Sequence, residues 1–445
     1  MMPLDKIRSL ALLVVLSLQA GCNRSSQPIT IRIAGDDWFL KSLVDTGMIA
    51  AYEKTGERIE LLNRNDRTIM QDLNGEHSPY DIVVMRHRWL GTLVQKHEVQ
   101  SIDSFLQDPA LNDAGFQPRQ QLFPDWWREL SWYGDKVYGY PYTGLTAFLC
   151  YRKDLLDDRE NQRRFKARYH RDLTVPTNWK EYMQVAEFFT RPGDHFYGTY
   201  ISGKQGLALW YEWLNFVYSF GGDILDTQHG WENGDIVVNS PNNVAATEQY
   251  VKLIAFSPPD TLNYGWNEAQ AALQQEHAFM GLLWSDQAYL LEDRAKSKVA
   301  GKIGYSRIPS NSGQSSSQLE GLTYLIPTGS AHAWEAYRFL AWAMSDQVQV
   351  SQTLHGSNSI RQSVYEDARV RQMPYTGVFL ASVPIAKEKS TLPESSQMTE
   401  AIESHLSEIV TGKESAQGGL DKLAHNLQQI LGSKTKLRYP VHPAP

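Results

Sequence analysis

The order of apolar and polar positions along the chain predicts alternating strands and helices. Three short apolar runs near the N-terminus each end in a polar turn that leads into a helical pattern, and they lie at 29–34, 58–62 and 80–85. Such a β-α-β-α-β series is typical of a parallel sheet, on which ligands bind beyond the carboxyl ends of the strands. The polar turns at 36–38, 63–66 and 86–88 are therefore expected on one rim.

A second series of elements follows. Further strands are predicted at 195–201, 277–283, 302–308 and 322–326, and further helices at 178–190, 206–220, 242–255, 266–275, 331–344, 396–410 and 416–431. A chain of 445 residues exceeds what one core usually holds, so an α/β protein with two lobes is expected. The first lobe is predicted at 28–146 and 309–362, the second at 147–308 and 363–432, with a loose tail at 433–445.

The stretch 131–156 lies between the two series. Glycines and a proline at 134–141 indicate a turn region, so Tyr140 and Tyr142 are predicted in an exposed loop. A buried strand is predicted directly afterwards, at 146–152. We expect the chain to cross between the lobes here.

Composition narrows the class of partner. The net charge is −7 and there is no run of Lys and Arg, so nucleic acid is not an expected partner. The 13 Trp and 22 Tyr exceed what a core needs, and such rings suit ligands with apolar faces and hydroxyl rims. Enzyme signatures such as a nucleophile elbow, a phosphate loop or paired metal-binding histidines are missing, so neither catalysis nor a cofactor or metal is predicted.

The N-terminus reads as a targeting segment, predicted as a signal peptide over 1–22. A basic start precedes an apolar run at 10–18 that is too short to span a bilayer. Two small residues before Cys22 resemble a bacterial lipobox, in which this cysteine is lipidated; a plain secretory signal cut nearby is the alternative. Cys150 is the other cysteine, so an internal disulfide is excluded and a buried, inert thiol is expected.

Several short stretches share a pattern in the same order along the chain. They are G-D-K-V-Y-G-Y-P-Y at 134–142 with Y-R-K-D-L-L at 151–156, Y-D-I-V-V at 80–84, V-Q-S-I-D-S-F-L at 99–106, P-T-N-W-K-E at 176–181, G-G-D-I-L at 221–225, A-F-M with a later Trp at 278–284, and T-G-K-E-S-A at 411–416. Together they resemble the family 1 extracellular solute-binding proteins of bacterial ABC importers, the group that captures sugars. One departure is the extra Asn178 before the tryptophan.

The resemblance implies a periplasmic binding protein fold of type II-like topology, in which hinge crossings join two lobes that close over a solute without chemistry. It implies an exported, monomeric receptor on the periplasmic side, anchored through Cys22, with a carbohydrate ligand and an ABC permease as partners. A solute sensor for a signalling partner remains an alternative. So does a secreted carbohydrate-active enzyme, in which Asp36 or Asp66 would face Asp286 at about 5 to 10 Å.

The candidate ligand contacts come from two sources, the strand ends predicted above and the family resemblance. Trp284 follows the strand at 277–283, matches the family's cleft tryptophan and is expected to stack on a sugar, with Asp286 in reach of a hydroxyl. Gly321 and Arg361 are nominated from the resemblance alone. The full set is Asp36, Trp38, Arg64, Asp66, Arg86, Tyr142, Trp210, Trp213, Trp284, Asp286, Gly321 and Arg361. Core packing is the alternative for the tryptophans and helix capping for Asp36; Trp179, Trp266 and Trp334 are predicted core residues.

Arginines are frequent on the predicted rim, where Arg64, Arg67, Arg86 and Arg88 follow two of the strands. Several guanidinium groups together favour planar anions such as carboxylates, so an acidic saccharide such as a uronate is one candidate ligand. The alternative is that these arginines form salt bridges with Asp66 or are solvated.

Overall fold

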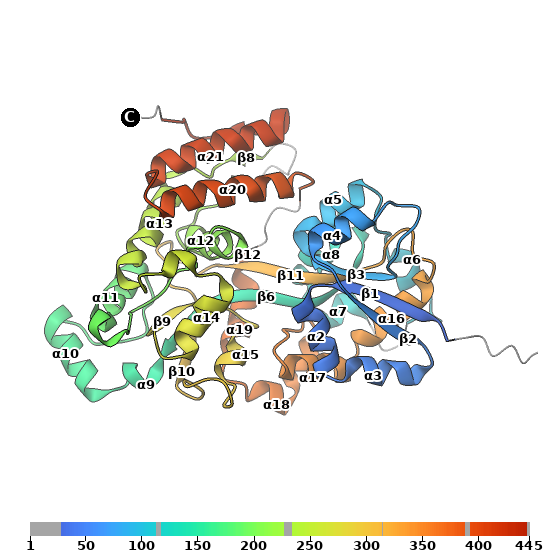
Figure 1. Cartoon of the computed structure of the whole chain (residues 1–445), viewed down its shortest axis with the longest axis horizontal. Coiled ribbons are helices and arrows are strands. Elements are labelled where there is room, and N and C mark those ends of the chain that lie inside the picture. Colours follow the sequence, from blue (N-terminus) through green and yellow to red (C-terminus); the bar gives the residue numbers. More distant parts are fainter. Residues whose placement is uncertain (1–27, 113–116, 227–233, 314, 388–391, 443–445) are drawn as a thin grey trace, which may run out of the picture.

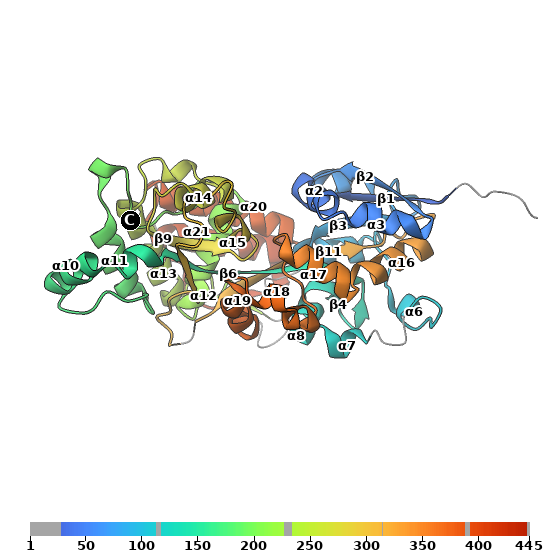
Figure 2. The same ribbon diagram turned by 90° about the horizontal axis from the view of Figure 1, so that it is seen from below.

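The computed structural model describes residues 28–112, 117–226, 234–313, 315–387 and 392–442. Figure 1 shows two bodies side by side, and strands β6 (Gly139–Arg152) and β11 (Ser317–Leu325) run between them. Figure 2, turned by 90°, shows β6 in the same connecting position. The predicted signal peptide at 1–22, with Cys22, lies outside the described residues.

The first lobe is built on a parallel sheet, as predicted. Strand β1 (Thr30–Gly35) pairs in parallel with both β2 (Arg58–Asn63) and β3 (Ile82–Arg86). Helix α2 (Asp37–Asp45) follows β1, and α4 (Asp66–Asp72) follows β2, where Asn65 caps the helix by accepting from the Thr68 N–H. The carboxyl ends of all three strands therefore meet at one edge, which confirms the predicted rim.

Strand β6 belongs to both lobes. Its first half pairs with β11, and its second half pairs with β9 (Met280–Trp284) and β10 (Ile303–Ser306), all antiparallel. One sheet of order β10-β6-β11-β3-β1-β2 thus continues from one body into the other, with β9 also paired to β6. A strand shared in this way is the chain crossing that the sequence predicted.

Tyr140 and Tyr142 lie in β6 and are buried, so their prediction as exposed loop residues is wrong. The ladder with β11 shifts register at this point, where Thr143 pairs with Leu322 and Pro141 pairs with Thr323. A proline has no N–H to donate and fits a sheet best at such an irregularity. The strand therefore passes through a sequence that resembles a turn.

Helices surround a separate core in the second lobe. They are α11 (Trp179–Phe189), α12 (Leu207–Ser219), α13 (Pro241–Lys252), α20 (Ser395–Val410) and α21 (Ala416–Leu431). Helix α12 is buried almost throughout, and the ring of Phe216 stacks on Trp179 at 4.0 Å. These helices confirm the predicted ones. The segment predicted as a strand at 195–201 makes only two isolated bridges in the described structure, from Phe196 to Arg191 and from Tyr197 to Ala278.

The remaining helices and strands are shorter or cover the edges. The helices are α3 (Met48–Tyr52), α5 (Leu90–Gln95), α6 (Asp103–Leu106), α7 (Pro118–Gln121), α8 (Pro124–Ser131), α9 (Lys153–Leu156), α10 (Arg159–Tyr169), α14 (Trp266–Gln274), α15 (Ala288–Leu291), α16 (Ala333–Ala343), α17 (Asp346–Leu354), α18 (Ala368–Arg371) and α19 (Thr376–Ser382). The strands are β4 (Trp132–Tyr133), β5 (Lys136–Val137), β7 (Leu225–Asp226), β8 (Asp235–Ile236), β12 (Ala386–Lys387) and β13 (Lys436–Leu437).

The segment around α19 lies at the junction of the lobes. Phe379 packs on Trp126 of α8, with ring centroids 5.6 Å apart, while Tyr375 packs on Tyr305 of β10 at 5.7 Å. The predicted assignment of 363–432 to the second lobe therefore remains a prediction for this segment.

The end of the chain is not the loose tail predicted for 433–445, as far as it is described. Strand β13 pairs in parallel with β8, and the Nδ1 of His442 lies 3.0 Å from Oδ2 of Asp421 in α21. Backbone pairing and a buried carboxylate thus fix the tail to the second lobe. Within the described residues, no helix is long and apolar enough to cross a membrane.

Candidate functional site

A cavity of about 400 Å³ lies between the two lobes. Its first-lobe wall comes from residues around the rim and from β11, and its second-lobe wall from α12, α14, β9 and the turn after β9. The lining residues are Trp38, Arg86, Leu145, Tyr211, Trp266, Asn267, Gln270, Trp284, Asp286, Gln287, Leu290, Glu320 and Leu322. This volume and this mixture of aromatic and polar side chains are those of a small-molecule site.

Three tryptophans from three separate elements line the cavity. Trp38 is in the first turn of α2 and is 40% exposed, Trp266 begins α14, and Trp284 ends β9. The ring of Trp284 packs against that of Tyr211 at a centroid distance of 5.9 Å, which supports it from behind. Three indole faces drawn from both lobes can cover the apolar faces of a ring-shaped ligand.

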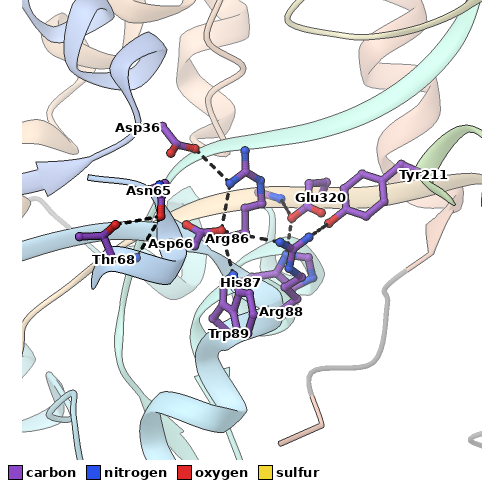
Figure 3. A network of polar contacts seen from close by, with 11 residues as sticks. Asp36, Asn65, Asp66, Thr68, Arg86, His87, Arg88, Trp89, Tyr211 and Glu320 are labelled. Carbon is purple, nitrogen blue, oxygen red and sulfur yellow. Dashed lines mark hydrogen bonds and ion pairs between the residues drawn. The ribbon is translucent and has the colours of Figure 1, made fainter. Parts of the chain in front are cut away.

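Arg86 lies at the centre of a charged cluster on the first-lobe wall (Figure 3). Its Nη1 donates to Oδ2 of Asp36 and to Oδ2 of Asp66, both at 3.0 Å. Burial raises the pKa of Asp36, and Arg86 opposes that effect. The predicted alternative for the rim arginines, ion pairing with Asp66, is therefore what the structure contains at Arg86.

The cluster extends across the lobes. Asp66 also accepts from Nε1 of Trp89 at 2.8 Å, and Arg88 donates through Nη1 to the hydroxyl of Tyr211, on α12 of the second lobe, at 2.7 Å. Beside it, Nδ1 of His87 lies 2.8 Å from Oε1 of Glu320 on β11. A continuous set of polar contacts thus links the rim to the opposite wall (Figure 3).

Asp286 is a lining residue with one side-chain oxygen that makes no hydrogen bond to the described residues. It lies two residues beyond the end of β9, its Oδ1 is buried, and this oxygen has no hydrogen-bond partner in the described part of the chain. Burial raises the pKa of the Asp286 carboxyl to about 6, although backbone N–H groups of Asp286 and Gln287 oppose the shift. A buried carboxylate oxygen without a partner is costly unless a ligand supplies one.

Residues 41–350 match the family described as bacterial extracellular solute-binding protein. The chain belongs to this family. It is 26% identical over 312 residues to a probable ABC transporter-binding protein of Deinococcus radiodurans, a match that covers 67% of this chain and 70% of the relative. Membership of a family that binds solutes agrees with the prediction that this chain is not an enzyme.

Solved structures show the same fold. An ABC transporter solute-binding protein from Agrobacterium radiobacter in complex with ribitol has a TM-score of 0.76 at 22% identity, covering 91% of this chain and 99% of that one. A maltose-bound protein of T. maritima has a TM-score of 0.75 at 19% identity, covering 90% and 100%. The predicted α/β periplasmic binding protein fold is thereby confirmed.

Four nominated residues of this solute-binding protein line its cavity: Trp38, Arg86, Trp284 and Asp286. Two more, Asp36 and Asp66, accept from Arg86. Trp266 was expected in the core, and that prediction is wrong because it begins α14 at the cavity wall. Trp334 was also expected in the core but is 43% exposed. Trp179 is fully buried, as predicted.

Three nominated aromatic residues do not line the cavity. Tyr142 is buried in β6, where its ring packs on Phe39 at 4.7 Å and its hydroxyl bonds to Ser42. Trp213 is fully buried and donates from Nε1 to Thr247 at 2.8 Å, while Trp210 is 6% exposed on the same helix. Their burial favours core packing, the alternative for the two tryptophans, and a ligand contact at these positions stays a prediction.

The other three nominated residues contact protein groups away from the cavity. Arg64 is half-exposed, with Nε 4.0 Å from Oδ2 of Asp72. A side chain on Gly321 would collide with Leu130, so this backbone faces α8 and not the cavity. Arg361 pairs with both carboxylate oxygens of Asp346 at 2.6 and 3.1 Å. None of the three is among the lining residues of this cavity, and their role as ligand contacts stays a prediction.

Sequence reasoning missed several lining residues, chiefly Tyr211, Trp266 and Glu320. Tyr211 lies between the nominated Trp210 and Trp213, but successive helix positions are rotated by about 100°, so it faces a different way. Glu320 carried a usable signal, because a charged residue inside the apolar strand β11 needs a partner or a function.

The lone thiol has the predicted character. Cys150 is fully buried in β6, and burial raises its pKa well above the usual range. Burial and the raised pKa both disfavour the reactive thiolate, in agreement with the inert thiol that the sequence predicts. Among the residues that the structure describes, no group of three His, Cys, Asp or Glu side chains is arranged to hold a metal ion.

Proposed function

We propose that this solute-binding protein captures a carbohydrate or polyol in the cavity between its lobes and delivers it to an ABC permease. The observation that carries the proposal is the set of three indole rings, Trp38, Trp266 and Trp284, around a cavity that also offers amide and carboxylate groups. Indole faces suit the C–H faces of a sugar, and the polar groups suit its hydroxyls. The relatives in complex with ribitol and maltose support this ligand class.

Closure of the lobes is part of the proposal. Strands β6 and β11 connect the lobes, and Arg88 bonds to Tyr211 across the gap. A ligand that contacts both walls stabilises the closed form, and a permease can recognise that form. The predicted lobe ranges, 28–146 with 309–362 and 147–308 with 363–432, belong to this proposal.

The two alternatives differ in their support. A receptor that reports solute to a signalling partner would share every feature of the cavity and differ in its partner alone. The enzyme alternative required Asp36 or Asp66 to act against Asp286, but both first-lobe carboxylates accept from Arg86. They are thus engaged by a cation, and family membership favours binding without turnover.

An acidic ligand fits the charges of the cavity poorly. Arg86 is already paired with two carboxylates, and Asp286 and Glu320 add negative charge to the lining. We therefore expect neutral sugars and polyols to raise the melting temperature, because a ligand that binds the folded state alone stabilises it by mass action. Uronates are expected to bind at least about tenfold more weakly than their neutral parents, since like charges repel across a binding site.

The measurement is a thermal-shift screen over neutral sugars, polyols, uronates and amino acids at fixed ionic strength. A uronate that raises the melting temperature more than its neutral parent would restore the acidic-ligand hypothesis. A response to amino acids and to no sugar or polyol would overturn the carbohydrate proposal.

Lipid anchoring is a further part of the proposal. Cys22 follows two small residues and a short apolar run, and it lies outside the described residues. The Cys22→Ser variant is expected either to stay uncleaved or to become soluble, because the thiol that would carry the lipid is lost. Fractionation of membranes checks this, with Cys150→Ser as the matched control. A Cys22→Ser protein that is processed and membrane-bound like the wild type would contradict the anchor.

A further inference from the structure

We propose that the solute carries a protonated amine and that Asp286 selects for it, so that the ligand class is an amino sugar or amino polyol. The inference rests on the proposed function and makes its ligand more specific. It starts from one carboxylate on the cavity wall, whose Oδ1 has no hydrogen-bond partner among the described residues.

Asp286 lies where a ligand would meet it. It is two residues beyond Trp284, both residues line the cavity, and the Oδ1 of Asp286 is buried without a hydrogen-bond partner. No ion pair joins Asp286 to a basic side chain in the part of the chain that the structure describes. This oxygen is buried and receives no hydrogen bond from the described residues, so a donor on the ligand can supply one.

The residues that face Asp286 supply no positive charge. Tyr142 in β6 and Tyr375 before α19 both lie close enough that the charge of Asp286 helps to raise their pKa, after the larger effect of burial. Neither tyrosine is cationic. Arg86 is the basic residue among the described lining residues, and Asp36 and Asp66 both accept from it.

The rest of the lining also favours a cation. Glu320 adds a second carboxylate, and three indole rings present faces whose quadrupole attracts positive charge. A protonated amine would form a charge-assisted hydrogen bond with Asp286, which is stronger than the bond from a hydroxyl. The same cavity would still accept neutral hydroxyls through Asn267, Gln270 and Gln287, whose side chains offer donors and acceptors.

Calorimetric titration at pH 7 with matched pairs tests the inference. The pairs are glucosamine with glucose, galactosamine with galactose, and mannosamine with mannose. We expect the amine of at least one pair to bind about tenfold or more tightly than its neutral parent, since a hydrogen bond to a charged group exceeds a neutral one. In Asp286→Asn the amine should lose its tenfold advantage, and the affinity for the neutral sugar should change by less than about threefold.

The pH dependence of binding is a second test of the inference. An amine needs the ionised form of Asp286, whose pKa is about 6 in the free protein, so the advantage of the amine should be lost as the pH falls through 6. The exposed Glu366, which lies outside the cavity lining, provides a control, and Glu366→Gln should retain the amine preference at pH 7. Asp286→Asn is expected to fold, because the amide keeps the shape of the side chain and removes a charge that burial disfavours.

Three outcomes of these experiments would contradict the inference in different ways. Neutral sugars that bind as well as their amines in every pair would overturn the inference and leave the proposed function intact. An amine preference that survives in Asp286→Asn would overturn the role of Asp286. Failure of every sugar and amine of these pairs to bind, together with no response to any sugar or polyol in the thermal-shift screen, would overturn the proposed function and this inference together.

Discussion

Replacing Trp284 with alanine is expected to weaken solute binding by more than about thirtyfold, because loss of a central aromatic anchor typically costs more than about 2 kcal/mol. Trp284 ends β9 at the cavity and is held by the ring of Tyr211. Stability should fall as well, since this residue is 9% exposed, but by less than the about 3 to 5 kcal/mol that emptying a core position costs.

Two other tryptophans serve as matched controls. Trp179→Ala should cost the full core penalty without changing the affinity of the protein that remains folded, because Trp179 is fully buried away from the cavity. Trp334→Ala should change neither quantity, because this ring is 43% exposed and lies outside the lining. Calorimetric titrations and denaturant melts separate the three variants. Unchanged affinity in Trp284→Ala, together with a large loss of stability, would make Trp284 a core residue.

Asp66→Ala is expected to lower the free energy of unfolding by about 3 kcal/mol, at the lower end of the cost of breaking a buried ion pair. Asp66 is 8% exposed, and its Oδ2 accepts from both Arg86 and Trp89. Without Asp66, Trp89 loses its acceptor, whereas Arg86 keeps its ion pair with Asp36. The remaining pair explains why the loss should not reach the upper end of that range.

Arg64→Ala is the matched control for this second variant. Its ion pair with Asp72 is long, at 4.0 Å, and both side chains are more than a third exposed, so the loss should stay below about 1 kcal/mol. Urea melts at pH 7 measure both variants. Equal losses in the two variants would show that the cluster around Asp66 contributes no more than a surface pair.

The rim of the first lobe could be predicted because its determinants are local. Each apolar run of β1, β2 and β3 ends in a polar turn, and parallel pairing places those turns at one edge. The sequence therefore placed Asp36, Asp66 and Arg86 together. It left open whether Arg86 pairs with acids or with ligand, since that depends on distances between separate strands.

Other features depend on the assembled structure. The path of β6 through Pro141 requires the register shift opposite Thr323, which β11 imposes from far along the chain. Trp266 and Trp179 each begin a helix and have similar local patterns, yet one lines the cavity and the other is core. The packing of those helices on the second lobe, and not their own periodicity, determines which tryptophan remains accessible.

A crystal structure of the protein with the ligand that raises its melting temperature most is the most direct test of the central claim. The account predicts the ligand between the lobes, with its apolar faces against Trp284 and at least one of the other two cavity tryptophans, and a polar group at Asp286. A ligand bound instead in the separate groove lined by Pro241, Val244 and Tyr439, with the cavity between the lobes empty, would contradict the account.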